Sequence, residues 1–236
     1  MILHNDSSYM IYFGDCKDPC VKSNTKISLN CLKKIKNRLH LEKIIVLNQL
    51  HGIKGICLKD LSTSFSEVSF MQKTGDYIIT NISKIGIGVL TADCLPIIFY
   101  DPVHNIIAIA HAGWRGAVKE IAKNLIQKME QSFNTYTQKL IVYLAPSAKF
   151  CCYQVDNKFL NHLENSTFIN QVILKRQNKY FFDLPKFVRL QLLDLGIKEN
   201  NIHQNYNDCT ICNTKFCSFR RQNGTSSRQV TVVALK

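Results

Sequence analysis

Three side chains that suit a divalent metal occur at similar places in the sequence. His51 follows an apolar run at 44–50. Cys94 lies between two apolar runs, and His111 comes directly after another, at 106–110. Side chains at the ends of strands often meet at one edge of a sheet, where rigid sites are normally built. We therefore expect these three side chains to converge.

Two imidazoles and one thiolate form a borderline-soft donor set that suits Zn²⁺. Three protein ligands instead of four leave a position for water or substrate, which is typical of catalytic zinc. Such an ion lowers the pKa of its bound water to about 7 and polarises an attacked centre. Asp93, next to Cys94, could orient a ligand, shuttle a proton or neutralise charge. The residue types alone leave an alternative open, in which the histidines are solvated and the cysteine packs, because no local C-x-x-C or H-E-x-x-H motif ties the three together.

The Gly-Trp-Arg-Gly segment at 113–116 is a second candidate site. Its two glycines let the backbone turn tightly and approach a ligand. The helix expected to follow would present unpaired N–H groups, and Arg115 could hold a phosphate in bidentate fashion. The alternative is a glycine-rich strand-to-helix turn in which Trp114 is a packing anchor.

The elements that position these residues can be read from hydrophobic periodicity. Apolar residues at i, i+3/i+4 spacing predict an amphipathic helix at about 115–131, and a second helix around 187–195 has start signals at Asp183 and Pro185 and a stop signal at Gly196. Many strands with few, irregularly ordered helices indicate an α+β fold with mixed β-sheets. Without repeats or linkers, we expect one domain over 1–236. The predicted strands are 44–47, 77–80, 85–90, 96–100, 106–110, 140–144 and 229–235.

Composition and charge limit the compartments and partners to be expected for the protein. The formal charge of +13 comes from 30 Lys+Arg against 17 Asp+Glu, but the basic residues are scattered. No apolar stretch approaches the roughly 20 residues that cross a bilayer. The first residues lack a basic region followed by an apolar one, so we expect no secretory signal and a cytoplasmic protein. In that compartment the ten cysteines should more often pack, bind metal or react than form disulfides.

Taken together, these motifs resemble the YfiH-like family, whose members are variously described as polyphenol oxidase or laccase-domain proteins, peptidoglycan editing factors and purine nucleoside phosphorylases. The resemblance extends from about Ser28 to the end of the chain. Its most specific pieces are Thr-Ala-Asp-Cys-Leu-Pro at 91–96 and His-Ala-Gly-Trp-Arg-Gly at 111–116. Further pieces are Gln-Leu-His-Gly at 49–52, Gly-Asp at 75–76, Cys-Cys-Tyr-Gln-Val at 151–155, Cys-Thr-x-Cys at 209–212 and Ser-Phe-Arg-Arg at 218–221.

The resemblance implies that His51, Cys94 and His111 are ligands of one zinc ion. It also implies an α/β/β/α architecture like that of the cytotoxic necrotising factor catalytic domain. The associated activities are phosphorolysis of adenosine, guanosine, inosine or methylthioadenosine, and deamination of adenosine. We expect a purine nucleoside beside the zinc, with water attacking C6 in deamination and inorganic phosphate attacking C1′ of the ribose in phosphorolysis. The proposed catalytic residues are Asp93 and Arg115, and the proposed substrate-binding residues, including alternative phosphate holders, are Arg38, Gln49, Cys152 and Arg220.

Two departures from the family pattern concern substrate geometry. The Phe-Ser/Thr-Arg and Gly-Gly elements usual near the N-terminus are replaced by Tyr-Phe-Gly-Asp-Cys-Lys at 12–17. The usual Gly-Pro-x-Ile-Gly reads Ala-Pro-Ser-Ala-Lys at 145–149. We expect substrate and phosphate contacts to differ here, and the metal ligands to be retained.

The cysteine-rich C-terminus suggests a second zinc site, formed by Cys209 and Cys212 with Cys217. A closed structural site needs four ligands, so His203 or a distant cysteine would have to complete it. Since a similar Cys-x-x-Cys segment occurs in the family without being its metal site, we expect these cysteines to pack instead.

Three other functions are alternatives to that of a nucleoside enzyme. Removal of a wrongly incorporated amino acid from cell-wall precursors is also associated with the family. Copper-dependent phenol oxidation is disfavoured, since there are only seven histidines and no His-x-His pair. A non-enzymatic nucleic-acid-binding zinc protein should carry a basic stripe with interleaved aromatics, which is not found.

Overall fold

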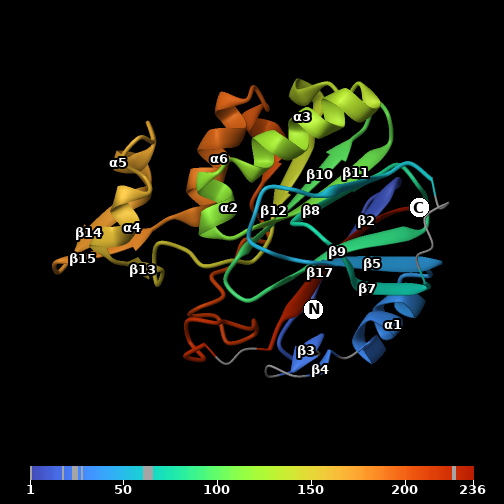
Figure 1. Cartoon of the computed structure of the whole chain (residues 1–236), viewed down its shortest axis with the longest axis horizontal. Helices are drawn as coiled ribbons and strands as arrows, with labels where there is room; N and C mark the ends of the chain where they lie inside the picture. The colour runs from blue at the N-terminus through green and yellow to red at the C-terminus, as the bar shows by residue number, and fades with distance from the viewer. Residues whose placement is uncertain (1, 18, 23–25, 28, 61–65, 225–226) are drawn as a thin grey trace.

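The computed structural model describes residues 2–17, 19–22, 26–27, 29–60, 66–224 and 227–236 (Figure 1). Ser28, where the family resemblance begins, lies outside the described residues. The α-helices are α1 (Leu29–Arg38), α2 (Trp114–Val118), α3 (Ile121–Phe133), α4 (Asn157–Asn161), α5 (Ile169–Val172) and α6 (Leu184–Asp194), and short 3₁₀ turns span Thr137–Lys139 and Glu199–Asn201. The strands are β1 (Ile2–Asn5), β2 (Tyr9–Phe13), β3 (Val21–Lys22), β4 (Lys26–Ile27), β5 (Lys43–Asn48), β6 (Ile56–Leu58), β7 (Val68–Thr74), β8 (Tyr77–Thr80), β9 (Ile85–Thr91), β10 (Leu95–Asp101), β11 (Ile106–Ala112), β12 (Ile141–Leu144), β13 (Gln154–Val155), β14 (Ile173–Arg176), β15 (Lys179–Phe182), β16 (Ile202–His203) and β17 (Gln229–Leu235).

Two mixed sheets form the centre of the described structure. One has the strand order β1-β2-β17-β9-β5-β7, and the other has the order β16-β12-β10-β11-β8-β6. Strand β5 runs parallel to both of its neighbours, β7 and β9, whereas β10 runs antiparallel to β11 and β12. The predicted α+β fold with mixed sheets is therefore confirmed.

Alternate residues of the central strands face different cores, as the pleat of a strand requires. In β5, Ile44 packs against the α1 side of the first sheet, whereas Ile45 lies between the two sheets. In β10, Ile97 packs against the side of α3 and α6, whereas Ile98 lies between the sheets. Figure 1 shows α1 on one outer side and α2, α3 and α6 on the other. The four layers confirm the expected α/β/β/α architecture.

The seven predicted strands are all present, with ends shifted by at most two residues. The second predicted helix is confirmed as α6, because the Asp183 carboxylate caps it by accepting from Lys186 N–H at 3.1 Å and Gly196 ends it with φ of +90°. The single helix predicted at 115–131 is wrong. The chain breaks between α2 and α3, where Glu120 adopts a left-handed φ of 58°. The apolar spacing continues in phase across this break, so periodicity alone gives no sign of it.

A smaller unit projects from the side of the sheets, where β13, β14 and β15 form a three-stranded sheet with α4 and α5 beside it (left in Figure 1). None of the helices in the described ranges combines the length and apolar character that a membrane crossing requires.

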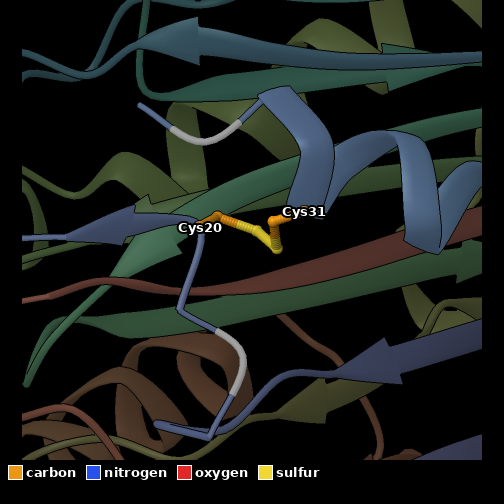
Figure 2. Close-up of a disulfide and its surroundings, with 2 residues drawn as sticks. All are labelled: Cys20 and Cys31. Atoms are coloured by element: carbon orange, nitrogen blue, oxygen red, sulfur yellow. A yellow bond between two sulfur atoms is a disulfide. The ribbon is translucent and has the colours of Figure 1, made fainter. Parts of the chain in front are cut away.

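One disulfide departs from the expectation that the cysteines avoid bridges. Cys20 and Cys31 are bonded beneath the first sheet, with Cα atoms 5.2 Å apart (Figure 2). Both residues are buried in the core that α1 covers. Cys31 lies in the first turn of α1, and the spacing of cysteines in the sequence does not reveal that it meets Cys20.

Candidate metal centre

The structure brings His51, Cys94 and His111 together at one edge of the two sheets. His51 lies in the loop after β5, Cys94 in the turn between β9 and β10, and His111 near the end of β11. One potential ligand atom from each lies within 4.8 Å of the other two. The two imidazole rings meet edge to face, with centroids 4.7 Å apart. This arrangement matches the convergence expected from the sequence.

Asp93 fixes the turn that carries Cys94. Its backbone has a positive φ of 85°, which is uncommon for a residue with a side chain. Its buried carboxylate accepts hydrogen bonds from the hydroxyls of Thr210 and Ser218, at 2.7 and 3.1 Å, and from Arg220 N–H at 2.7 Å. Since three donors hold both oxygens, this carboxylate binds the C-terminal loop to the turn.

Asp76 was given no role from the sequence, although it occurs in the Gly-Asp piece of the family pattern. Its carboxylate accepts from the backbone N–H groups of His51 at 2.9 Å and Gly52 at 2.7 Å. It also lies 2.9 Å from Nδ1 of His111. One buried carboxylate thus holds the His51 loop and orients the His111 ring, leaving Nε2 of His111 as the donor for a metal. The sequence signal for this carboxylate–histidine pair is that an aspartate directly precedes the predicted strand at 77–80.

Gly113 leaves room for the three side chains to approach. A Cβ atom at this position would lie 2.9 Å from Cδ2 of His51 and 3.1 Å from Sγ of Cys94. Any larger residue would therefore push two of the expected ligands away. The glycine expected to admit a phosphate instead makes space for the metal-ligand cluster.

The charges within the cluster favour the thiolate form of Cys94. Burial alone would raise the pKa of this thiol, but the His111 and His51 imidazoles lower it to about 6. Burial would lower the pKa of His111, whereas the Cys94 thiolate and the Asp76 carboxylate raise it to about 9. Because a metal binds the thiolate and the neutral imidazole, an ion at this cluster would displace the proton that the Cys94 thiolate and the Asp76 carboxylate stabilise on His111.

The donor set fits zinc with a free coordination position. His51 is exposed, Cys94 is half-buried and His111 is buried, so solvent reaches the cluster from the His51 side. Within the described ranges, no further His, Cys, Asp or Glu donor joins these three. Two nitrogens and one sulfur with an open side match the donor pattern of catalytic zinc better than that of structural zinc.

A groove of about 790 Å³ is lined by Trp114, the residue after Gly113, and by Arg220, whose backbone N–H binds the Asp93 carboxylate next to Cys94. Its lining includes the aromatic ring of Tyr153 and the cations of Lys179 and Arg220. Burial raises the pKa of the Tyr153 phenol, and the negative charge of Cys94 raises it further. Aromatic faces and cations suit a flat base carried with a phosphate.

The arginines predicted to contact phosphate lie in different surroundings. Arg220 reaches the groove, with its guanidinium over the Tyr153 ring at 5.0 Å and bonded to the carbonyl of Gln154 at 2.9 Å. Arg115 is exposed and lies over the Trp114 ring at 4.4 Å. Arg220 therefore lines the groove, whereas Arg115 contacts Trp114 but is not among the lining residues.

Arg38 and Gln49 have other surroundings. Arg38 is the exposed last residue of α1, before β5 begins, whereas His51 follows the end of β5. The six residues of β5 separate the two positions by about 20 Å. The Gln49 amide donates to the carbonyl of Leu90 at 2.8 Å and accepts from its N–H at 2.7 Å, so it joins the His51 loop to β9.

Cys152 lies in a second cysteine cluster. The sulfur atoms of Cys151, Cys152, Cys209 and Cys212 all lie within 4.8 Å of one another. Cys209 is buried, as expected for a packed cysteine, whereas Cys212 is exposed. The two other residues considered as their partners are placed elsewhere.

Cys217 is buried, with its backbone N–H donating to the Gln229 side chain at 2.6 Å, and burial raises the pKa of its thiol to about 12. The ring of His203 stacks on Tyr143 with centroids 4.7 Å apart. Neither residue joins the cysteine cluster.

Comparison with known proteins yields matches along nearly the whole chain. The family model described as multi-copper polyphenol oxidoreductase laccase matches residues 15–236. A purine nucleoside phosphorylase of Clostridium acetobutylicum is 27% identical over 98% of this chain and 94% of its own. The adenosine deaminase RL5, from an unknown prokaryotic organism, is 32% identical over 68% of this chain and 62% of its own. Among solved structures, the hypothetical protein YfiH of Bacillus licheniformis has the same fold, with a TM-score of 0.85, 22% identity and coverage of 97% of this chain and 93% of its own.

Proposed function

This chain belongs to the YfiH-like family, whose model carries the multi-copper polyphenol oxidoreductase laccase description, and we propose that it is a zinc-dependent purine nucleoside phosphorylase that also deaminates adenosine. We assign both activities to one catalytic domain over 1–236. The observation that carries the proposal is the three-donor cluster with an open side, next to a groove lined by aromatic rings and cations. The names of the two relatives support the substrate class.

In this proposal His51, Cys94 and His111 hold the metal. Zinc bound by such a set supplies Lewis acidity and lowers the pKa of water. The Asp76 carboxylate keeps the His111 ring in one orientation, and Asp93 keeps the Cys94 turn in place. Both carboxylates therefore act on the ligands, and we assign Asp93 a positioning role.

The substrate contacts follow from the groove. The purine stacks against Trp114 and Tyr153, with C6 or C1′ turned toward the metal cluster in the two reactions. Arg220, with Arg115 at the other side of Trp114, holds the phosphate. In phosphorolysis a phosphate oxygen bonds to C1′ as the bond from C1′ to N9 breaks, and the freed purine takes up a proton. In deamination water adds to C6 and ammonia leaves.

A product assay tests the proposal. Purified zinc-loaded protein with adenosine and phosphate should give adenine and ribose 1-phosphate, and with adenosine alone inosine and ammonia, both separable by chromatography. Arg220→Ala should raise the KM for phosphate about tenfold or more, since a charge-assisted hydrogen bond contributes about 1.5–3 kcal/mol. The matched control Arg38→Ala removes an equal charge at the opposite end of β5 and should leave this KM unchanged. Absence of both product sets, with turnover of cell-wall precursors instead, would replace the proposal with the editing activity.

A further inference from the structure

We infer that Cys151, Cys152, Cys209 and Cys212 form a second, structural zinc site, separate from the proposed catalytic cluster. The four sulfur atoms come from two segments that lie far apart in the sequence, and all lie within 4.8 Å of one another. A zinc ion with Zn–S bonds of about 2.3 Å in a tetrahedron has sulfur–sulfur edges of about 3.8 Å. The sulfurs of Cys151 and Cys212 lie 4.0 Å apart, close to that edge length.

Backbone pairing holds the two segments in register. Ser147 N–H donates to the carbonyl of Asp208, and Thr210 N–H donates to the carbonyl of Ser147, each at 3.0 Å. This short parallel bridge fixes Cys209 beside the segment that leads to Cys151. The convergence of the sulfurs therefore rests on an ordered backbone.

Two cations bind the backbone of the segments that carry the sulfurs. The ammonium of Lys149, two residues before Cys151, donates to the carbonyl of Asn207, two residues before Cys209, at 2.9 Å. The Arg221 guanidinium donates to the carbonyls of Thr210 and Ile211, which lie between Cys209 and Cys212, at 2.6 and 2.9 Å. Four thiolates with one Zn²⁺ carry a charge of −2, which nearby cations offset.

Packing does not explain this cluster. Cysteines that act as small hydrophobic residues are buried, yet Cys151 and Cys212 are exposed and only Cys209 is buried. Four thiolates close a tetrahedral site completely, so the second ion would have no position for a reactant. The inferred role is to hold the loop after Cys209 against the segment before Cys152.

The loop held in this way supports the first cluster. Thr210, next to Cys209, donates to the Asp93 carboxylate at 2.7 Å, and Asp93 precedes Cys94. Ser218 and Arg220 of the same region donate to Asp93 as well. The second ion would therefore position one wall of the proposed active site without contacting substrate.

Metal content tests the inference independently of activity. The full chain, purified under reducing conditions and equilibrated with Zn²⁺, should hold two zinc ions per chain by elemental analysis after free metal is removed. Cys212→Ser and Cys94→Ala should each hold one, and the double variant should hold none. Cys212→His should again hold two because histidine also binds zinc. Cys57→Ser, which alters a free cysteine outside both clusters, should hold two.

The Cys94→Ala protein decides the outcome even if the Cys212 variants do not fold. Loaded with Co²⁺, it should show the intense thiolate-to-metal charge-transfer and visible bands of a tetrahedral four-sulfur site. Loss of all metal from Cys94→Ala would overturn the inference. A wild-type chain that holds one zinc ion under reducing conditions would also overturn it, whether the four cysteines are free thiols or form a disulfide.

Discussion

The two clusters differ in donor number, donor type and support. His51, Cys94 and His111 come from three turns or strand ends, mix nitrogen with sulfur and leave one side open. The four-cysteine cluster comes from two loops and offers sulfur alone. A carboxylate, Asp76, orients the first cluster, whereas backbone pairing of Ser147 with the segment at 208–210 holds the second. In the two proposals, the number of protein ligands would separate a metal used for reaction from one used for stability.

The substitution Cys94→Ala should have the largest effect and tests the different roles assigned to the two clusters. Loss of the thiolate should reduce phosphorolysis and deamination to the uncatalysed level, because the proposed reaction depends on the metal. The Tm of the metal-free protein should stay close to wild type, since no bound ion then contributes to the free energy of unfolding of either protein. Activity assays beside a thermal melt check both expectations, and a large fall in Tm with retained turnover would reverse the assigned roles.

Cys212→Ser should have the opposite signature. Because Cys212 is exposed, replacing its sulfur by oxygen should lower the free energy of unfolding mainly through the loss of the zinc ligand. At free zinc about 1,000 times the Kd, binding contributes about 4 kcal/mol to the free energy of unfolding. We expect a corresponding fall in Tm of the zinc-loaded protein, measured by calorimetry. Equal melting curves for variant and wild type in the presence of zinc would contradict the structural role.

The substitution Asp76→Asn tests how much the supporting carboxylate contributes to zinc affinity at the first cluster. An amide keeps the size of the side chain but lacks the negative charge that orients His111 and supports its donation. Zinc affinity of the first cluster should fall about 10–100-fold, as is usual for such partners. Competition with a chelating dye in the Cys212→Ser background measures this cluster alone, and an unchanged affinity would remove Asp76 from the site.

Gly113→Ala should have the smallest effect of the four. The added Cβ would lie 2.9 Å from the His51 ring, so the loop after β5 must shift. We expect a few-fold loss of zinc affinity at the first cluster and an unchanged second zinc ion. An unchanged zinc affinity, measured by competition with a chelating dye, would contradict the close approach of this position to the ligands.

Sequence reasoning succeeded where local pattern and tertiary structure agree. The buried strands are short β-branched runs, and the capping residues of α6 mark its start and end. The break at Glu120 was missed because the apolar phase continues through it. The role of Asp76 was missed because its contacts lie 24, 25 and 35 residues away in the chain. The four-cysteine cluster was missed for the same reason, since Cys152 and Cys209 lie 57 residues apart in the sequence.

X-ray absorption at the zinc edge, on Cys212→Ser protein that retains only the first cluster, tests the central claim most directly. The claim predicts two nitrogen neighbours at about 2.0–2.1 Å, one sulfur at about 2.3 Å and one light, exchangeable neighbour. That sulfur signal should disappear when Cys94 is also replaced. A fourth protein donor, or a zinc environment without sulfur, would contradict an open site built from His51, Cys94 and His111.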